Sequence, residues 1–143
     1  MAILSKDYFR RDRHEGITAP DLRKDCTYAE HVVRARGKRT QLTSVSLDSS
    51  KLSDFGPALY QAKRPELKND GHALVEHADL ISALREAALS STKDEKVRAI
   101  QALRYATRRK EGLVTWKFDT AGVEAKDVIN WAFARVQKYF VKK

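Results

Sequence analysis

The sequence predicts a single domain of the α+β class, because strand-like segments alternate with helical ones along a chain of only 143 residues. Hydrophobic residues make up 42% of the chain and charged residues 33%, a balance typical of folded globular proteins rather than disordered ones. A chain of this length has room for one hydrophobic core, so we expect residues 1–143 to form one domain. Since Met1 stands directly before the first predicted strand, we also expect this domain to be cut from a longer protein.

The first third of the chain predicts two strands with a short helix between them. Residues 3–13 alternate loosely and carry aromatic side chains, which is typical of a strand. Thr27 followed by Glu30 has the spacing of a capping box, so a helix is expected over 28–36. Residues 41–47 alternate polar and apolar side chains and are rich in hydroxyl and β-branched types, which favours a second strand.

The middle of the chain predicts helices. Residues 48–60 indicate a short helix that stops near Gly56 and Pro57, and the polar stretch 63–71 indicates an exposed loop. Thr92 and Glu95 have capping-box spacing, and we expect Gly112 to end the helix that they begin. Two apolar stripes near helical period support a pair of helices here, Leu74, Ala78, Ile81, Leu84, Ala88 and Leu89 in the first and Val97, Ile100, Leu103 and Ala106 in the second.

The C-terminal part predicts a strand at 113–118 and, after a turn, an aromatic-rich segment at 128–141 that is either helical or extended. Cys26 is the only cysteine, which excludes an internal disulfide and argues against a structural zinc site. No signal peptide is recognisable, and no apolar run approaches the roughly 20 residues needed to span a bilayer. We therefore expect a cytoplasmic protein without a metal or a membrane partner.

The strong positive charge predicts a polyanionic partner. Lysine and arginine number 28 against 19 aspartate and glutamate residues, a formal net charge of +9. Basic residues gather in three segments, at 34–39, 104–110 and 137–143. Each segment alone also fits a solvated face that aids solubility. Together they favour a surface that binds RNA, DNA or an acidic inhibitor protein, and the charge does not choose among these.

Four short segments carry a resemblance to a known family. In chain order they are Phe9-Arg10-x-Asp12, Gly16-Ile17-Thr18-Ala19, Tyr28-x-x-His31 and Leu42-Thr43-Ser44-Val45-Ser46-Leu47. This succession resembles the first half of ADP-ribosyltransferase toxins of the cholera and pertussis type. The resemblance covers 9–52 well and 113–136 weakly, and it does not extend to the helical middle. It implies a small fold in which short split β-sheets surround a cleft for NAD, with flanking helices.

The resemblance also implies roles for two of the charged residues. Arg10 would clamp the pyrophosphate of NAD, which a planar guanidinium does better than a lysine. His31 would hydrogen-bond a ribose hydroxyl of the same molecule. Without the resemblance, Arg10 reads as the partner of Asp12 in an ordinary ion pair on an edge strand, and His31 as a histidine at the edge of the core.

The hydroxyl-rich strand departs from the family's Ser-Thr-Ser motif. By resemblance, Thr43, Ser44 and Ser46 would line the floor of the nicotinamide pocket and orient the catalytic acid. One alignment lays Thr43 and Ser44 over the last two positions of the motif and puts Leu42 at the first. The other alignment starts the motif at Thr43 and puts Val45 at its middle position. Both stay open, and we prefer Ser44 as the functional hydroxyl.

The catalytic carboxylate is the second departure. The family's acid normally opens the late strand, often as Glu-x-Glu, and no such pair occurs here. Glu111 precedes the predicted strand and Asp119 follows it, so both are candidates. Glu111 also fits a surface residue at the end of a helix. The segment from Gly122-Val123 to Trp131 resembles the segment that follows the catalytic strand in the family, and it lies further along the chain from Glu111 than is usual there.

The resemblance implies a NAD-dependent mono-ADP-ribosyltransferase toxin that consumes NAD as a substrate in the cytosol of a target cell. The missing second acid leaves room for an acceptor other than arginine, and the net charge favours RNA slightly over protein. Family analogy further implies a monomer that binds an acidic immunity protein. The alternative is a basic RNA-binding or ribonuclease toxin without NAD chemistry, in which His14 or His31 would serve as general acid or base.

Overall fold

Six short strands form one antiparallel sheet in the computed structural model, which describes residues 7–13, 16–34 and 39–143. Across the sheet the strands follow the order β4-β5-β2-β1-β3-β6. Their bounds are Phe9–Asp12 (β1), Leu42–Ser46 (β2), Ala58–Ala62 (β3), Ala73–Val75 (β4), Glu111–Thr115 (β5) and Phe140–Lys142 (β6). Together with the helices, this sheet confirms a small α+β fold.

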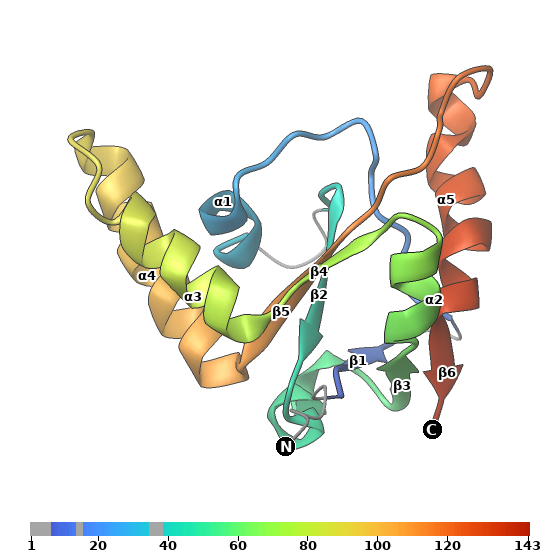
Figure 1. Ribbon diagram of the computed structural model, residues 1–143, viewed down its shortest axis with the longest axis horizontal. Helices are drawn as coiled ribbons and strands as arrows, with labels where there is room; N and C mark the ends of the chain where they lie inside the picture. Colours follow the sequence, from blue (N-terminus) through green and yellow to red (C-terminus); the bar gives the residue numbers. More distant parts are fainter. Residues whose placement is uncertain (1–6, 14–15, 35–38) are drawn as a thin grey trace.

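The sheet is divided between β1 and β2. These two strands share the single pair Phe9↔Ser46, whereas β2 pairs with β5 along its whole length, from Leu42↔Thr115 to Ser46↔Glu111. In Figure 1, β2, β4 and β5 run together, while β1, β3 and β6 form a second group near the C-terminus. The backbone therefore holds the two groups together at one narrow point.

Helices flank both groups of strands (Figure 1). Helices α3 and α4 lie against each other with α1 beside them, and α2 and α5 lie at the other end of the sheet. None of the described helices combines the length and the apolar character that crossing a bilayer requires. Their bounds are Tyr28–Val32 (α1), Arg64–Asn69 (α2), His77–Ala87 (α3), Lys93–Arg109 (α4) and Val128–Val136 (α5), with 3-10 helices at Ser49–Phe55 (η1), Ala125–Asp127 (η2) and Gln137–Tyr139 (η3).

Alternation along the strands gives each face of the sheet its own core. Leu42 and Leu113 pack with α1, α3 and α4, whereas Val45 and Val114 pack on the opposite face with residues that include Val136 of α5. Successive side chains in a strand point to opposite faces. Ser44 and Ser46 of β2 and Glu111 of β5 therefore share the face covered by α1, α3 and α4.

The elements near the N-terminus follow the prediction closely. Thr27 and Glu30 form the capping box, since the backbone N–H of Glu30 donates to Thr27 Oγ1 at 3.1 Å and the backbone N–H of Thr27 donates to Glu30 Oε1 at 3.2 Å. The helix that they begin ends earlier than expected, at Val32. The first strand covers 9–12, and residues 3–6 of the predicted strand lie outside the described part of the chain.

Three elements were predicted wrongly between residues 58 and 75. The stretch 63–71 is not a loop but contains helix α2, because Pro65 lies in the first turn, where a missing N–H breaks no hydrogen bond, and Leu67 is fully buried. The helix predicted within 48–60 stops where expected, since η1 ends at Phe55 and Gly56 is its C-cap, but strand β3 after it was not predicted. Strand β4 takes Leu74 out of the first predicted helical stripe. Both strands are short, and their partners lie far away in the sequence.

Helix α4 was predicted in the right place but with wrong details. Thr92 makes no capping hydrogen bond, and Glu95 instead accepts one from the Ser90 hydroxyl at 2.7 Å. Val97 and Ile100 are exposed, because the helix buries its narrow alanine face, Ala99, Ala102 and Ala106, against its neighbours.

The segment after α4 places Glu111 in a strand. Gly112 does not end the helix, which closes at Lys110 in a left-handed conformation. Gly112 lies inside β5, where a Cβ atom would come within 2.7 Å of the Tyr8 ring and 2.9 Å of the Val75 carbonyl oxygen. The predicted strand 113–118 thus begins two residues earlier, at Glu111. The segment 128–141, for which helix and strand were both left open, contains α5, η3 and the start of β6.

Candidate active site

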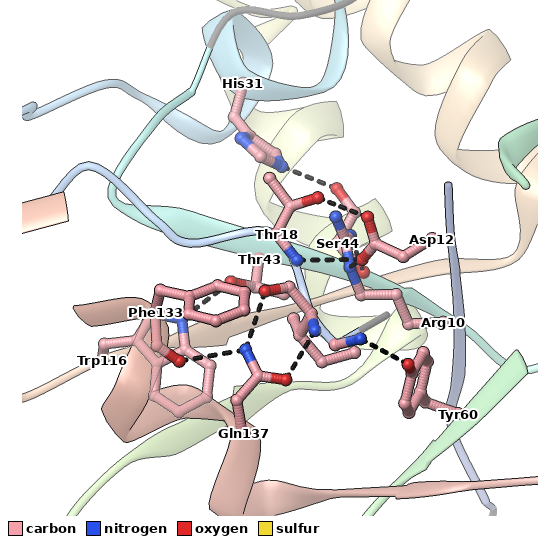
Figure 2. Close-up of polar contacts among 12 residues, drawn as sticks. Arg10, Asp12, Thr18, His31, Thr43, Ser44, Tyr60, Trp116, Phe133 and Gln137 are labelled. Atoms are coloured by element: carbon pink, nitrogen blue, oxygen red, sulfur yellow. Dashed lines mark hydrogen bonds and ion pairs between the residues drawn. The ribbon is translucent and has the colours of Figure 1, made fainter. Parts of the chain in front are cut away.

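Arg10 of β1 reaches across the division of the sheet to β2. Its Nη1 donates to the carbonyl oxygen of Ser44 at 2.8 Å, and its Nε donates to Asp12 Oδ2 at 2.9 Å. Asp12 is buried and also accepts hydrogen bonds from the backbone N–H of Thr18, at 3.0 Å, and from the Thr18 hydroxyl. Arg10 thus forms an ion pair with Asp12 that orients its half-buried guanidinium (Figure 2). Among the described residues, Nη2 has no hydrogen-bond acceptor, so it can bind a further one.

A chain of hydrogen bonds joins β2, α1 and β5. The Ser44 Oγ lies 3.0 Å from Glu111 Oε2 and 2.6 Å from His31 Nε2, and the His31 Nδ1 lies 2.6 Å from Thr40 Oγ1. Thr40 Oγ1 in turn accepts from the backbone N–H of Leu42 at 3.0 Å. Three side chains from residues 31–44 thus form one continuous network with Glu111, which lies 67 residues after Ser44.

The donors in this network have one consistent direction when Glu111 is ionised. A carboxylate only accepts, so the single Ser44 proton is donated to Glu111. His31 must then donate its Nε2–H to Ser44, and its Nδ1 accepts the proton of the Thr40 hydroxyl. Burial, with Arg10 and Arg34 nearby, lowers the pKa of His31 to about 4, which agrees with a neutral ring in this tautomer.

Glu111 is a buried acid with one unpaired oxygen. The residue is 2% exposed, and its Oε1 has no hydrogen-bond partner among the residues that the structure describes. Arg109 forms an ion pair with it, but its Nη1 lies 3.9 Å from that oxygen, too far for a hydrogen bond. Burial raises the pKa of Glu111 to about 7, against the opposing effects of the Ser44 hydrogen bond and of Arg109 and Arg10. The carboxyl group therefore changes its charge near neutral pH.

The three predicted hydroxyl residues of β2 have different surroundings. Thr43 points to the opposite face, where its Oγ1 accepts from Trp116 Nε1 at 2.8 Å (Figure 2). Ser46 is bonded to the backbone, with the Arg109 carbonyl as one of its partners. Ser44, the hydroxyl that we preferred, is the one that contacts the Glu111 carboxylate.

Asp119 lies apart from this network. It is exposed in the segment after β5, and its Oδ1 accepts from the backbone N–H of Ala121 at 2.9 Å. Within the described residues it forms no hydrogen bond or ion pair with Arg10, Ser44 or Glu111. Of the two candidate carboxylates, the structure brings Glu111 alone to the predicted site residues, and Asp119 caps a turn.

The segment 16–18 is clamped beside Arg10 by residues that the sequence did not single out. The Gln137 side chain accepts from Ile17 N–H at 2.7 Å and donates to the Ile17 carbonyl at 2.9 Å, and Gly16 N–H donates to the Tyr60 hydroxyl (Figure 2). Gly16 has a φ of +87°, and a Cβ atom there would lie 2.6 Å from Gln137 Oε1. The sequence could not predict this contact, because 120 residues separate Gln137 from Ile17.

The other histidines take no part in this network in the described part of the chain. His72 is buried and accepts from Lys117 N–H at 3.0 Å, and half-buried His77 contacts the Glu111 carbonyl through Nδ1 at 2.8 Å. His14 lies outside the described residues. Among those that are described, no group of at least three His, Cys, Asp or Glu side chains is arranged to hold a metal ion. Comparison of the chain with protein families, curated proteins and solved structures found no match.

Proposed function

We propose that this protein is a NAD-dependent mono-ADP-ribosyltransferase that transfers ADP-ribose to a macromolecule, with RNA ahead of protein as the acceptor. The observation that carries the proposal is the meeting of Arg10, His31 and Ser44 with the buried carboxylate of Glu111. These residues come from two strands of one half of the sheet, one strand of the other half, and a helix. The resemblance in sequence implies site roles for all four, and also for Thr43, Ser46 and Asp119, which have other partners.

The unpaired oxygen of Glu111 supports a positively charged binding partner. Buried carboxylate oxygens without a donor are rare, because each loses its hydration without a replacement. A reaction that develops positive charge next to this oxygen would be stabilised by it. Cleavage of the bond between ribose and nicotinamide is such a reaction, since its transition state resembles an oxocarbenium ion.

Each residue of the site would have a separate role that follows from its chemistry. The Arg10 guanidinium, oriented by Asp12 and the Ser44 carbonyl, would bind the pyrophosphate oxygens of NAD through its remaining N–H groups. Ser44, supported by neutral His31, would hold the Glu111 carboxylate in place. Both ring nitrogens of His31 are bonded to Thr40 and Ser44, so we assign it this supporting role instead of the bond to a ribose hydroxyl that the resemblance implies. Glu111 would stabilise the positive charge that develops on the ribose while the bonding electron pair leaves with nicotinamide. The acceptor's nucleophilic atom then bonds to the ribose carbon and its proton passes to solvent.

The ribonuclease form of the alternative needs a histidine that can exchange protons, and of its two candidates, His14 and His31, the structure describes His31. Both ring nitrogens of His31 are hydrogen-bonded, and the pKa of His31 is lowered to about 4. Such a ring is a poor general acid at neutral pH. This favours transfer from NAD over hydrolysis of RNA by His31.

The experiment that tests the proposal follows nicotinamide release from NAD together with the transfer of labelled ADP-ribose to RNA or protein. Glu111→Gln should abolish both, whereas Asp119→Asn, the same change at an exposed carboxylate, should leave both near the wild-type level. RNA cleavage by the wild-type protein without NAD, with no nicotinamide release, would support the alternative instead. By family analogy we also propose that the protein acts as a monomeric toxin in the cytosol of a target cell and is inhibited by an acidic immunity protein.

A further inference from the structure

Arg109 stands between the active site and the exposed end of α4. Its Nη1 lies 3.9 Å from the unpaired Glu111 Oε1, and its side chain is 35% exposed. The guanidinium carbon lies 5.2 Å from the centre of the Phe55 ring and 5.4 Å from that of Tyr105. Arg109 is thus a partly exposed cation that contacts two aromatic rings and lies next to the proposed catalytic carboxylate.

The surface around Arg109 is strongly basic. Arg108 lies 6.0 Å from the same Tyr105 ring, and Arg104 is exposed one helical turn earlier. Lys110 and Lys51 of η1 both act on Asp48, whose pKa is lowered mainly by Ser50 and further by these two lysines. We call this surface the basic rim, defined by Lys51, Arg104, Arg108, Arg109 and Lys110.

We propose that the basic rim binds single-stranded RNA as the acceptor for ADP-ribose, an inference that rests on the proposed function and names its substrate class. Positive charge at Arg109 would repel an arginine or lysine side chain that approached Glu111 as an acceptor. It would attract a phosphate group. The rim therefore selects an acceptor that carries negative charge next to its nucleophile.

The aromatic residues favour a nucleic acid over an acidic protein. Tyr105 is 37% exposed next to two guanidinium groups. Exposed rings and guanidinium planes stack on bases, while the cations follow the phosphates, as in proteins that bind single strands. In the transfer step an oxygen or nitrogen atom of the RNA bonds to the ribose carbon of ADP-ribose, the electron pair of the broken bond leaves with nicotinamide, and the displaced proton passes to solvent.

The test measures binding and transfer separately with the full chain. Fluorescence anisotropy with a labelled single-stranded RNA, across a range of salt concentrations, gives Kd and the number of phosphate contacts, since each contact adds about 0.7 to the slope of log Kd against log salt. Arg108→Glu should weaken binding at least about tenfold and reduce that slope. RNA labelling from NAD should fall in parallel, while nicotinamide release without RNA stays within about twofold of wild type.

Arg135→Glu is the matched control. Arg135 is also an exposed arginine on a helix next to an aromatic ring, 5.0 Å from the centre of Trp131, but it belongs to α5 at the other end of the sheet. Its substitution makes the same change in net charge and should leave RNA binding within about twofold of wild type. Equal losses in the two variants, or none in Arg108→Glu, would overturn the rim as the binding surface.

The outcomes also separate this inference from the proposed function. Nicotinamide release with unchanged RNA binding in Arg108→Glu would overturn the inference and leave the transferase standing. Loss of RNA binding in Arg108→Glu, together with a wild-type protein that never consumes NAD, would overturn the transferase and support the rim as an RNA-binding surface only. Tighter binding of single-stranded DNA or of duplex RNA than of single-stranded RNA would contradict the acceptor class.

Discussion

Ser44 Oγ of β2 lies 3.0 Å from Glu111 Oε2 of β5, although 67 residues separate the two in the chain. The antiparallel register, with Ser44 opposite Leu113 and Ser46 opposite Glu111, places both side chains on one face of the sheet. The hydroxyl and the backbone carbonyl of Ser44 therefore serve two different partners, Glu111 and Arg10. A single residue connects the proposed catalytic acid to the proposed phosphate clamp.

Replacing Ser44 by alanine should lower kcat for nicotinamide release by about a hundredfold, because Glu111 loses its hydrogen-bond donor and His31 loses its acceptor. Thr43→Ala, the same kind of change one position away, should lower the free energy of unfolding by about 1 kcal/mol through the loss of the Trp116 hydrogen bond and change kcat little. Steady-state kinetics and urea unfolding of both variants check this. Equal effects on kcat would contradict the assignment of Ser44.

Thr40 should act as a positioning residue. Thr40→Val removes the donor that keeps His31 Nδ1 unprotonated, so the ring can adopt the other tautomer and no longer donates to Ser44. We expect kcat to fall about tenfold with little change in KM, because the carboxylate is less well oriented while NAD binding is preserved. The NMR chemical shifts of the two ring nitrogens report the tautomer. Thr40→Ser should restore both the tautomer and kcat, and a valine variant with wild-type nitrogen shifts would sink the idea.

Activity should depend on pH through Glu111. Its pKa is raised to about 7 and the proposed chemistry needs the carboxylate, so kcat/KM should rise with pH and level off above that value. Arg109 favours the charged form, so Arg109→Gln should shift this limb to higher pH. The measurement is kcat/KM between pH 5 and pH 9 for both proteins. A profile that is flat across this range would contradict a catalytic Glu111.

The free energy of unfolding should also depend on the ionisation of Glu111, but here the neutral form is the favourable one. The folded pKa of Glu111 lies above its unfolded value, so its contribution to stability is complete below pH 4.5 and is lost as the pH rises through about 7. The rise in pKa corresponds to about 3 kcal/mol. Glu111→Gln keeps an acceptor for Ser44 and removes the buried charge, so it should stabilise the protein increasingly above pH 7.

Urea unfolding of wild type and Glu111→Gln at pH 5 and pH 8 checks this difference. The lowered pKa of His31 acts in the other direction, since its contribution is complete above pH 6.5 and is lost as the pH falls through about 4. His31 is present in both proteins, so its effect largely cancels in the comparison. A variant that is less stable than wild type at pH 8 would contradict the rise in the pKa of Glu111.

Local chemistry in the sequence determined the elements that depend on neighbouring residues. The capping box of Thr27 and Glu30, the alternation of β2 and the order of Arg10, His31 and Ser44 could all be read directly, because each depends on side chains a few residues apart. The apolar periodicity placed α3 and α4 approximately. It failed at β3, β4 and the buried face of α4, where the partners are distant strands and helices.

Only the tertiary structure decided which of the candidate groups meet. Sequence spacing put Glu111 at the expected end of the strand but kept Asp119 as a second candidate, and it left two alignments of the hydroxyl strand open. The pairing of β2 with β5 brings Ser44 to Glu111 and turns Thr43 to the other face. Burial of the site keeps His31 neutral and raises the pKa of Glu111 to about 7. Long-range pairing and desolvation are properties of the folded chain, and no local pattern encodes them.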